Sequence, residues 1–131
     1  MQTPLDIIEA FYAALAARDR DTLISLLKND IRITYFGQKT QLPWAGEFSG
    51  LDGFDTFFTR IRENLEIVSV ERDHIIADSK RVAVQCSGTW RVKHNQKQVS
   101  AGMMNVFTVE QNQISRYDIY VDTAAFFEAM A

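Results

Sequence analysis

Cysteine is nearly absent from this sequence, since Cys86 is the only one. A lone cysteine excludes an internal disulfide and any metal site that needs several cysteine ligands. Histidine is also scarce, and His74 and His94 are too far apart in the sequence to predict a metal site. We therefore expect neither a metal nor a cofactor.

Runs of one charge and long apolar runs are absent as well. The formal net charge is −3 and the pI is about 5.3, with lysines and arginines scattered along the chain. This pattern predicts neither a nucleic acid nor an anionic membrane surface as a partner. No apolar stretch approaches membrane-spanning length, and residues 1–6 lack the features of a signal peptide. The expectation is a cytoplasmic protein.

Aromatic residues, by contrast, are plentiful: nine Phe, four Tyr and two Trp in 131 residues. A chain of this length fits one domain, predicted to span residues 1–131, and can bury one substantial core. The aromatic side chains can fill that core or line a pocket for a small molecule.

Changes in apolar periodicity predict the fold. Helical spacing follows Thr3 and recurs over residues 23–27 and 54–65, and a short helix follows Asp122. Alternation predicts strands over 31–35, 67–77, 81–93, 98–110 and 114–121. Residues 37–53, with four glycines and Pro43, are expected to form a long loop. The order predicts an α+β fold, with a strongly curved antiparallel sheet, three helices on its concave face and a cone-shaped cavity.

The last predicted strand carries the first candidate catalytic residue. Alternation places Ile114, Arg116, Asp118 and Tyr120 on one face. Because a carboxylate is rarely kept inside without a partner, Asp118 is interpreted as a general acid/base facing an apolar cavity. The alternative is that Asp118 pairs with Arg116 on a partly solvated face of the sheet.

Asn105 is the second candidate catalytic residue. It alternates with Met103 and Phe107 on the neighbouring strand, so we expect it on a buried face, where an amide must find partners. It either donates to a ligand carbonyl, as groups that stabilise an oxyanion do, or bonds to the backbone.

Aromatic and cationic side chains complete the predicted ligand site. Trp44 and Phe48 lie in the long loop and are predicted to form a lid or pocket wall, with capping of the core as the alternative. The other predicted ligand contacts are Tyr12, Tyr35, Trp90, Arg116 and Tyr120. The aromatic members of this set are equally suited to a core.

The strand over 81–93 also predicts a partner. Gln85, Ser87, Thr89 and Arg91 alternate with its apolar residues and form a polar, small-residue surface. Such a surface can pack against its own copy about a two-fold axis, which predicts a homodimer.

Several short segments together resemble a known family. They are residues 11–15 (FYAAL), 26–30 (LLKND), 43–46 (PWAG), 50–53 (GLDG), 105–109 (NVFTV) and 120–124 (YVDTA). In order and spacing they resemble the SnoaL-like polyketide cyclase and ketosteroid isomerase branch of the nuclear transport factor 2-like superfamily, over residues 4–130. The resemblance implies a fold that hosts isomerases, cyclases, dehydratases, epoxide hydrolases and non-catalytic domains.

The resemblance can be carried over at four positions. The general base of ketosteroid isomerases falls at Tyr35, their oxyanion tyrosine at Phe11 and their neutral aspartic acid at Asn105. The acid/base aspartate of SnoaL-type cyclases falls at Asp118. Because the isomerase base and tyrosine are replaced, steroid isomerisation by the familiar route is not expected.

Three functions follow from these observations. The leading interpretation is a small-molecule-binding protein that acts as a cofactor-free isomerase, cyclase or dehydratase on a hydrophobic, carbonyl-bearing ligand. The alternative is a non-catalytic ligand-binding or dimerisation module. The third is an epoxide hydrolase-like use of Arg116 and Asp118 to activate water, with Glu47 as a second carboxylate.

Overall fold

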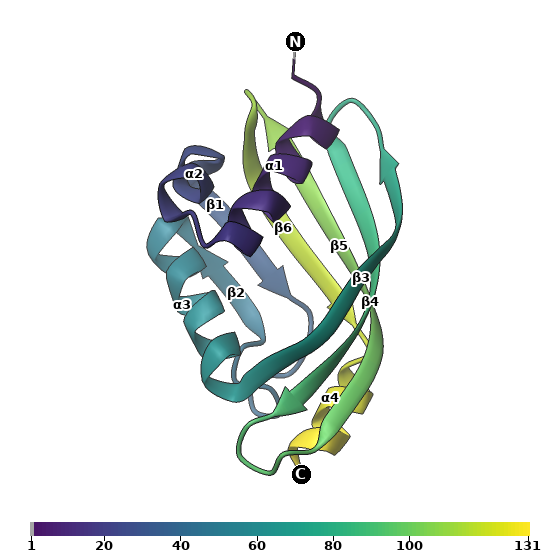
Figure 1. Ribbon diagram of the computed structural model, residues 1–131. Helices are drawn as coiled ribbons and strands as arrows, with labels where there is room; N and C mark the ends of the chain where they lie inside the picture. Colours follow the sequence, from purple (N-terminus) through teal and green to yellow (C-terminus); the bar gives the residue numbers. More distant parts are fainter. Residues whose placement is uncertain (1) are drawn as a thin grey trace.

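The computed structural model describes residues 2–131, which form four helices and six strands (Figure 1). The helices are α1 (Pro4–Ala17), α2 (Arg20–Ser25), α3 (Gly50–Asn64) and α4 (Thr123–Met130). The strands are β1 (Leu27–Tyr35), β2 (Gly46–Ser49), β3 (Leu65–Ala77), β4 (Arg81–Val92), β5 (Gln98–Glu110) and β6 (Gln113–Val121). Within residues 2–131, no helix combines the length and apolar character that crossing a membrane requires.

All six strands join one curved sheet in the order β2-β1-β6-β5-β4-β3. The predicted α+β fold with a curved sheet is therefore confirmed. The sheet is mixed rather than wholly antiparallel, because β1 and β6 run parallel while the other neighbouring pairs are antiparallel. Parallel neighbours need a long crossover connection, and residues 36–112 supply it here.

Side-chain caps fix where three of the helices begin. The hydroxyl of Thr3 accepts from the backbone N–H of Asp6, whose carboxylate accepts from the N–H of Thr3 in return. The carboxylate of Asp19 accepts from the first turn of α2, and that of Asp122 from the first turn of α4. Local polar signals thus set the ends of segments that packing then holds in place.

Residues 37–53 are more ordered than the predicted loop. Strand β2 pairs with the end of β1, and α3 begins directly after it. Gly46 and Gly50 have φ values of 112° and 74°, a left-handed backbone that favours glycine. Leu42 and Trp44 are fully buried, so the remaining loop folds into the core rather than over it.

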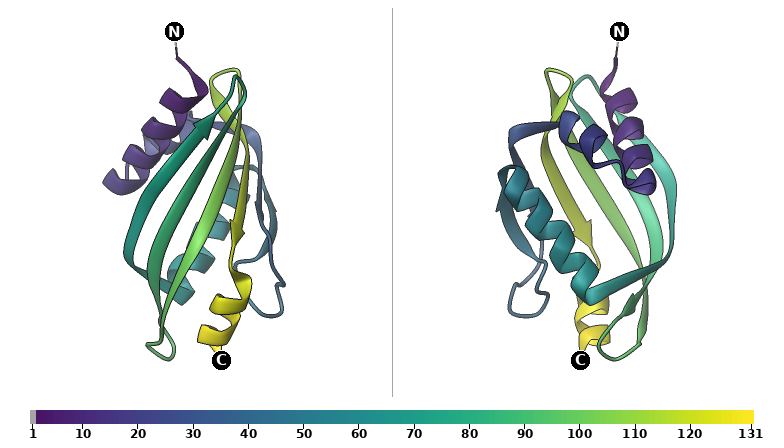
Figure 2. Two further views of the ribbon diagram at one scale, coloured as in Figure 1. Left: turned by 90° about the vertical axis from the view of Figure 1, so that its right-hand side faces the viewer. Right: turned by 60° about the vertical axis from the view of Figure 1, so that its left-hand side comes forward.

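The two faces of the sheet differ in what covers them. Helices α1, α2 and α3 lie on the concave face, and α4 closes one end (Figure 1). The left view of Figure 2 shows the convex face, over which no helix runs among the described residues. We call these the inner face and the outer face. The core lies between the inner face and the helices.

Candidate functional site

The strand register divides the predicted site residues between the two faces. Asn105 pairs with Ile119 on β6 and Val84 on β4, and all three are buried on the inner face. Asp118 pairs with Val106, one step along the strand, and therefore points to the outer face. The expectation that Asp118 and Asn105 share a cavity face is wrong.

A bulge in β6 explains this error. Val109 pairs with Ile114 but Thr108 pairs with Arg116, which leaves Ser115 as an extra residue. Strict alternation ends there, so Ile114 faces inward and is fully buried, whereas Arg116 faces outward. One extra residue exchanges the faces of every side chain that follows.

On the outer face, Asp118 forms the ion pair of the alternative interpretation. Arg116 Nη2 donates to Asp118 Oδ1 at 3.5 Å, and the two side chains are 45% and 16% exposed. Tyr120, a third predicted contact on this face, stacks on Phe36 with ring centroids 4.4 Å apart. These residues lie on the far side of the sheet from Asn105.

Asn105 is the most deeply buried polar side chain among the described residues, at 2% exposure. Its Nδ2 donates to the Tyr12 hydroxyl at 3.1 Å and lies 3.9 Å from the Cys86 sulfur, while Oδ1 has no partner. An unpaired buried polar atom costs about 1–3 kcal/mol. Such an atom in a native structure calls for an explanation.

Both neighbours of Asn105 hold their protons. Burial is the main cause that raises the pKa of Tyr12, and the bond from Asn105 and the charge of Arg72 offset only part of it. Burial also raises the pKa of the Cys86 thiol, and the negative charge of Asp73 adds to this effect. The site thus offers a neutral phenol and a neutral thiol.

Next to Asn105, two rows of paired residues across strands β4, β5 and β6 on the inner face are only partly covered by the helices. The Asn105 row lies beneath α1, and the row of Trp90 lies against Phe126 of α4. Between them lie Cys86, Met103, Val121, Gly88 and Ala101, of which only Cys86 is fully buried. We call these two rows the inner gap. A hollow of about 460 Å³ lies at the same level of the sheet but on the outer face, where Gln85, Gly102, Met104 and Tyr120 line it together with the intervening strand residues Cys86, Met103 and Val121.

Edge strand β3 borders the open side of the inner gap. Arg72 pairs with Cys86, and its guanidinium carbon lies 4.6 Å from the centre of the Tyr12 ring. The register shifts between Arg72 and His74, which leaves Asp73 in a bulge. Sequence reasoning missed Arg72 because it lies within a charged run on a strand whose bulge cannot be located from alternation.

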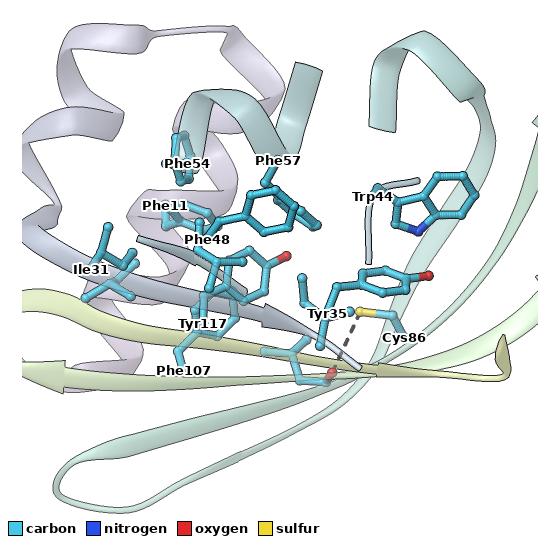
Figure 3. Close-up of a cluster of buried hydrophobic side chains, with 14 of the residues drawn as sticks. Phe11, Ile31, Tyr35, Trp44, Phe48, Phe54, Phe57, Cys86, Phe107 and Tyr117 are labelled. Atoms are coloured by element: carbon cyan, nitrogen blue, oxygen red, sulfur yellow. Dashed lines mark hydrogen bonds between the residues drawn. The ribbon is translucent and has the colours of Figure 1, made fainter. Parts of the chain in front are cut away.

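The other predicted aromatic contacts pack in the core. Trp44 is fully buried, and the Phe126 ring lies 6.1 Å from it and 5.2 Å from Trp90. Tyr35 meets Trp44 edge-on, with ring centroids 6.1 Å apart (Figure 3). The guanidinium carbon of Arg60 lies over the Phe48 ring, 5.4 Å from the ring centre. This packing corresponds to the alternative in which Trp44 and Phe48 cap the core.

Burial sets the chemistry of this core cluster. It raises the pKa of Tyr35 to about 12, although the nearby Trp44 indole lowers it in part. The Trp44 N–H points toward that hydroxyl without forming a hydrogen bond of normal geometry. Tyr35, which falls at the position of the isomerase base, is therefore a neutral core phenol.

Comparisons with known proteins agree with this architecture. The fold is that of the nuclear transport factor 2-like class. The sequence profile of the SnoaL-like domain matches residues 8–117, and the chain belongs to this family. No curated protein matches the sequence.

Solved structures show the same fold at low identity. An NTF2-like protein from Burkholderia xenovorans has a TM-score of 0.89 at 26% identity, with 100% of this chain and 99% of that chain covered. Another from Burkholderia thailandensis has a TM-score of 0.88 at 20% identity, covering 100% and 99%. An LEH-like epoxide hydrolase from M. tuberculosis has a TM-score of 0.69 at 22% identity, covering 94% and 85%.

Proposed function

We propose that the protein binds a small, largely apolar molecule in the inner gap, and that this molecule presents an acceptor oxygen to Tyr12 and a hydroxyl or bound water to Asn105. The unpaired amide atom of Asn105 carries the proposal. Buried polar atoms are rarely left without a partner, and a hydroxyl of the ligand or a water bound with it would supply the missing donor. The partly buried side chains of Met103 and Ala101 offer an apolar surface to the rest of the ligand.

The two polar groups complement each other. The Tyr12 hydroxyl accepts from Asn105, so its own proton remains free for a ligand carbonyl. The raised pKa of Tyr12 keeps that proton in place at neutral pH. The amide oxygen of Asn105 accepts in turn from a ligand hydroxyl or a bound water.

The arrangement favours binding over catalysis by Asp118. That carboxylate points to the outer face, and the inner gap presents Tyr12 and Cys86, which retain their protons. Acid–base catalysis is most efficient when the pKa of the catalytic group lies near the working pH. We therefore place a non-catalytic ligand-binding role ahead of cofactor-free isomerisation or cyclisation.

Binding of 2-acetonaphthone, a flat apolar ketone, tests this function against 2-ethylnaphthalene, which has a similar shape without the oxygen. The ketone should bind more tightly, and Tyr12→Phe, which removes the hydroxyl that donates to it, should lower its affinity about threefold to tenfold, the equivalent of one net hydrogen bond. The hydrocarbon should be unaffected by that change. Asp118→Asn is the matched control and should leave both affinities unchanged. Equal affinity of the two compounds for the unaltered protein would contradict the proposal.

The outer face supports a second part of the proposal, a homodimer. Gln85 and Ser87 lie on this helix-free face, together with the exposed, stacked rings of Phe36 and Tyr120. A two-fold axis would place the same surface of each copy in contact. Sedimentation equilibrium should give twice the chain mass at micromolar concentration, and Ser87→Arg should shift it toward the monomer. A monomer mass for the unaltered protein would reject the dimer.

A further inference from the structure

An unpaired cation lies at the rim of the inner gap. Arg72 is exposed, and the Tyr12 ring holds its guanidinium at 4.6 Å. Within residues 2–131, no carboxylate lies within ion-pair distance of Arg72, whereas Arg20, Arg91 and Arg116 each have such a partner. A cation–π contact at an exposed site contributes only about 0.5–1 kcal/mol. Its hydrogen-bond donors therefore remain available to a ligand.

The Tyr12 side chain contacts both the guanidinium of Arg72 and the amide of Asn105. The Tyr12 ring lies beneath Arg72, and the hydroxyl of the same ring bonds to Asn105. Strand pairing brings Arg72 opposite Cys86, whose sulfur lies 3.9 Å from the same amide. The Tyr12 ring therefore separates the Arg72 guanidinium from the buried amide of Asn105, and both groups border the inner gap.

Arg72 and Asp73 place charges of opposite sign near Tyr12 and Cys86. The positive charge of Arg72 lowers the pKa values of Tyr12 and Cys86, so it acts at both neighbours of Asn105. The negative charge of Asp73 acts on Cys86 in the other direction. Glu71, also on β3, pairs with Ser87 and belongs to the outer face. His74 pairs with Gln85 and lies on the outer face as well.

We propose that the ligand of the inner gap is an apolar carboxylic acid, bound as its anion by Arg72 and by Tyr12, whose hydroxyl Asn105 holds in place. This inference rests on the proposed function and specifies the class of ligand. Arginine presents a planar set of donors that matches a carboxylate. The carboxylate accepts from Arg72 and from the free Tyr12 proton, while the apolar body lies along Met103 and Ala101. Charge-assisted bonds of this kind are about twice as strong as neutral ones.

The test compares 2-naphthoate with neutral 2-acetonaphthone by calorimetry at pH 7.5 and constant ionic strength. The unaltered protein should bind the acid at least about tenfold more tightly than the ketone, in line with a hydrogen bond to a charged group. Arg72→Gln should remove that preference while leaving the affinity for the ketone within about twofold. Arg72→Lys should retain part of it, because a lysine supplies the charge without the planar donors.

Two further variants check the sign and the location of the effect. Asp73→Asn removes a negative charge from the rim and should strengthen binding of naphthoate but not of the ketone. Arg91→Gln is the matched control, because Arg91 pairs with Glu66 on the outer face. It should change neither affinity.

The outcomes separate this inference from the function on which it rests. If the ketone binds and depends on Tyr12 but naphthoate is not preferred, the acid class is wrong and the binding function stands. If naphthoate is preferred equally by the Arg72→Gln variant, Arg72 is not its partner and the inference is overturned. If neither compound binds, both proposals are rejected.

Discussion

Replacing Tyr12 and Asn105 together should make the protein more stable. In Tyr12→Phe/Asn105→Leu the hydroxyl and the amide disappear as a pair, so no polar group is left behind without its partner. Leucine has the same number of side-chain heavy atoms as asparagine, and the neighbouring Met103 is only partly buried, which leaves room for adjustment. A site retained for ligand binding at the expense of stability should respond in this way.

The size of the effect follows from the unpaired amide atom. Removing a buried unpaired polar atom should recover about 1–3 kcal/mol, whereas replacing both partners of a hydrogen bond by apolar groups is nearly neutral. We expect a net gain of about 1 kcal/mol in the free energy of unfolding. For a chain of this length that corresponds to a rise of about 3–5 °C in Tm. The single change Tyr12→Phe should instead destabilise, since it leaves the whole amide of Asn105 unpaired.

Urea denaturation followed by circular dichroism measures all four proteins of this double-mutant cycle. The two single variants should not add up to the double variant, because the groups share one hydrogen bond. A double variant destabilised by more than about 1 kcal/mol would refute the reasoning. That result would show that the pair serves the core, and the argument for a ligand would lose its main support.

Three other changes test separate parts of the structure. Gly88→Ala should destabilise by about 1–3 kcal/mol in urea denaturation, because its Cβ would lie 2.6 Å from the Trp90 ring; an unchanged midpoint would contradict the packing. Burial raises the pKa of Tyr35 to about 12 and that of Tyr117 well above its usual 10, so stability should be complete below pH 10 and fall as the pH rises toward 12. Tyr117→Phe should make that fall less steep in urea titrations, and an identical slope would count against the assignment. Asp118→Asn should change the unfolding free energy by less than about 1 kcal/mol, as expected for a partly exposed ion pair, and a larger loss would indicate a structural role beyond that pair.

The sequence supports the fold better than the site, and the reason is physical. Alternation over residues 81–93 and 98–110 predicts strands correctly, because apolar side chains that recur with period two share one face only in an extended backbone. The faces of Asp118 and Arg72 depend on bulges in β6 and β3. A bulge forms where pairing strands fit each other, so its position is a property of the pair and not of either segment alone.

Asn105 illustrates what alternation can establish. It lies between Met103 and Phe107 on an unbroken stretch of β5, so its predicted inner face is the one it occupies. Its partner Tyr12 could not be inferred, because the contact joins a helix to a strand 93 residues away. The parallel pairing of β1 with β6 escaped prediction for the same reason.

That parallel pairing also determines the order in which the chain can fold. Ile33 on β1 pairs with Tyr117 on β6, so this contact cannot form on the ribosome until the last strand has been synthesised. Contacts so distant in sequence form slowly, because a long segment must first be closed into a loop. The amides of β1 that bond to β6 should therefore gain protection late in pulsed hydrogen-exchange labelling, and early protection would contradict this order. Until then one side of β1 remains an open edge, which makes this interval the one most exposed to aggregation during synthesis.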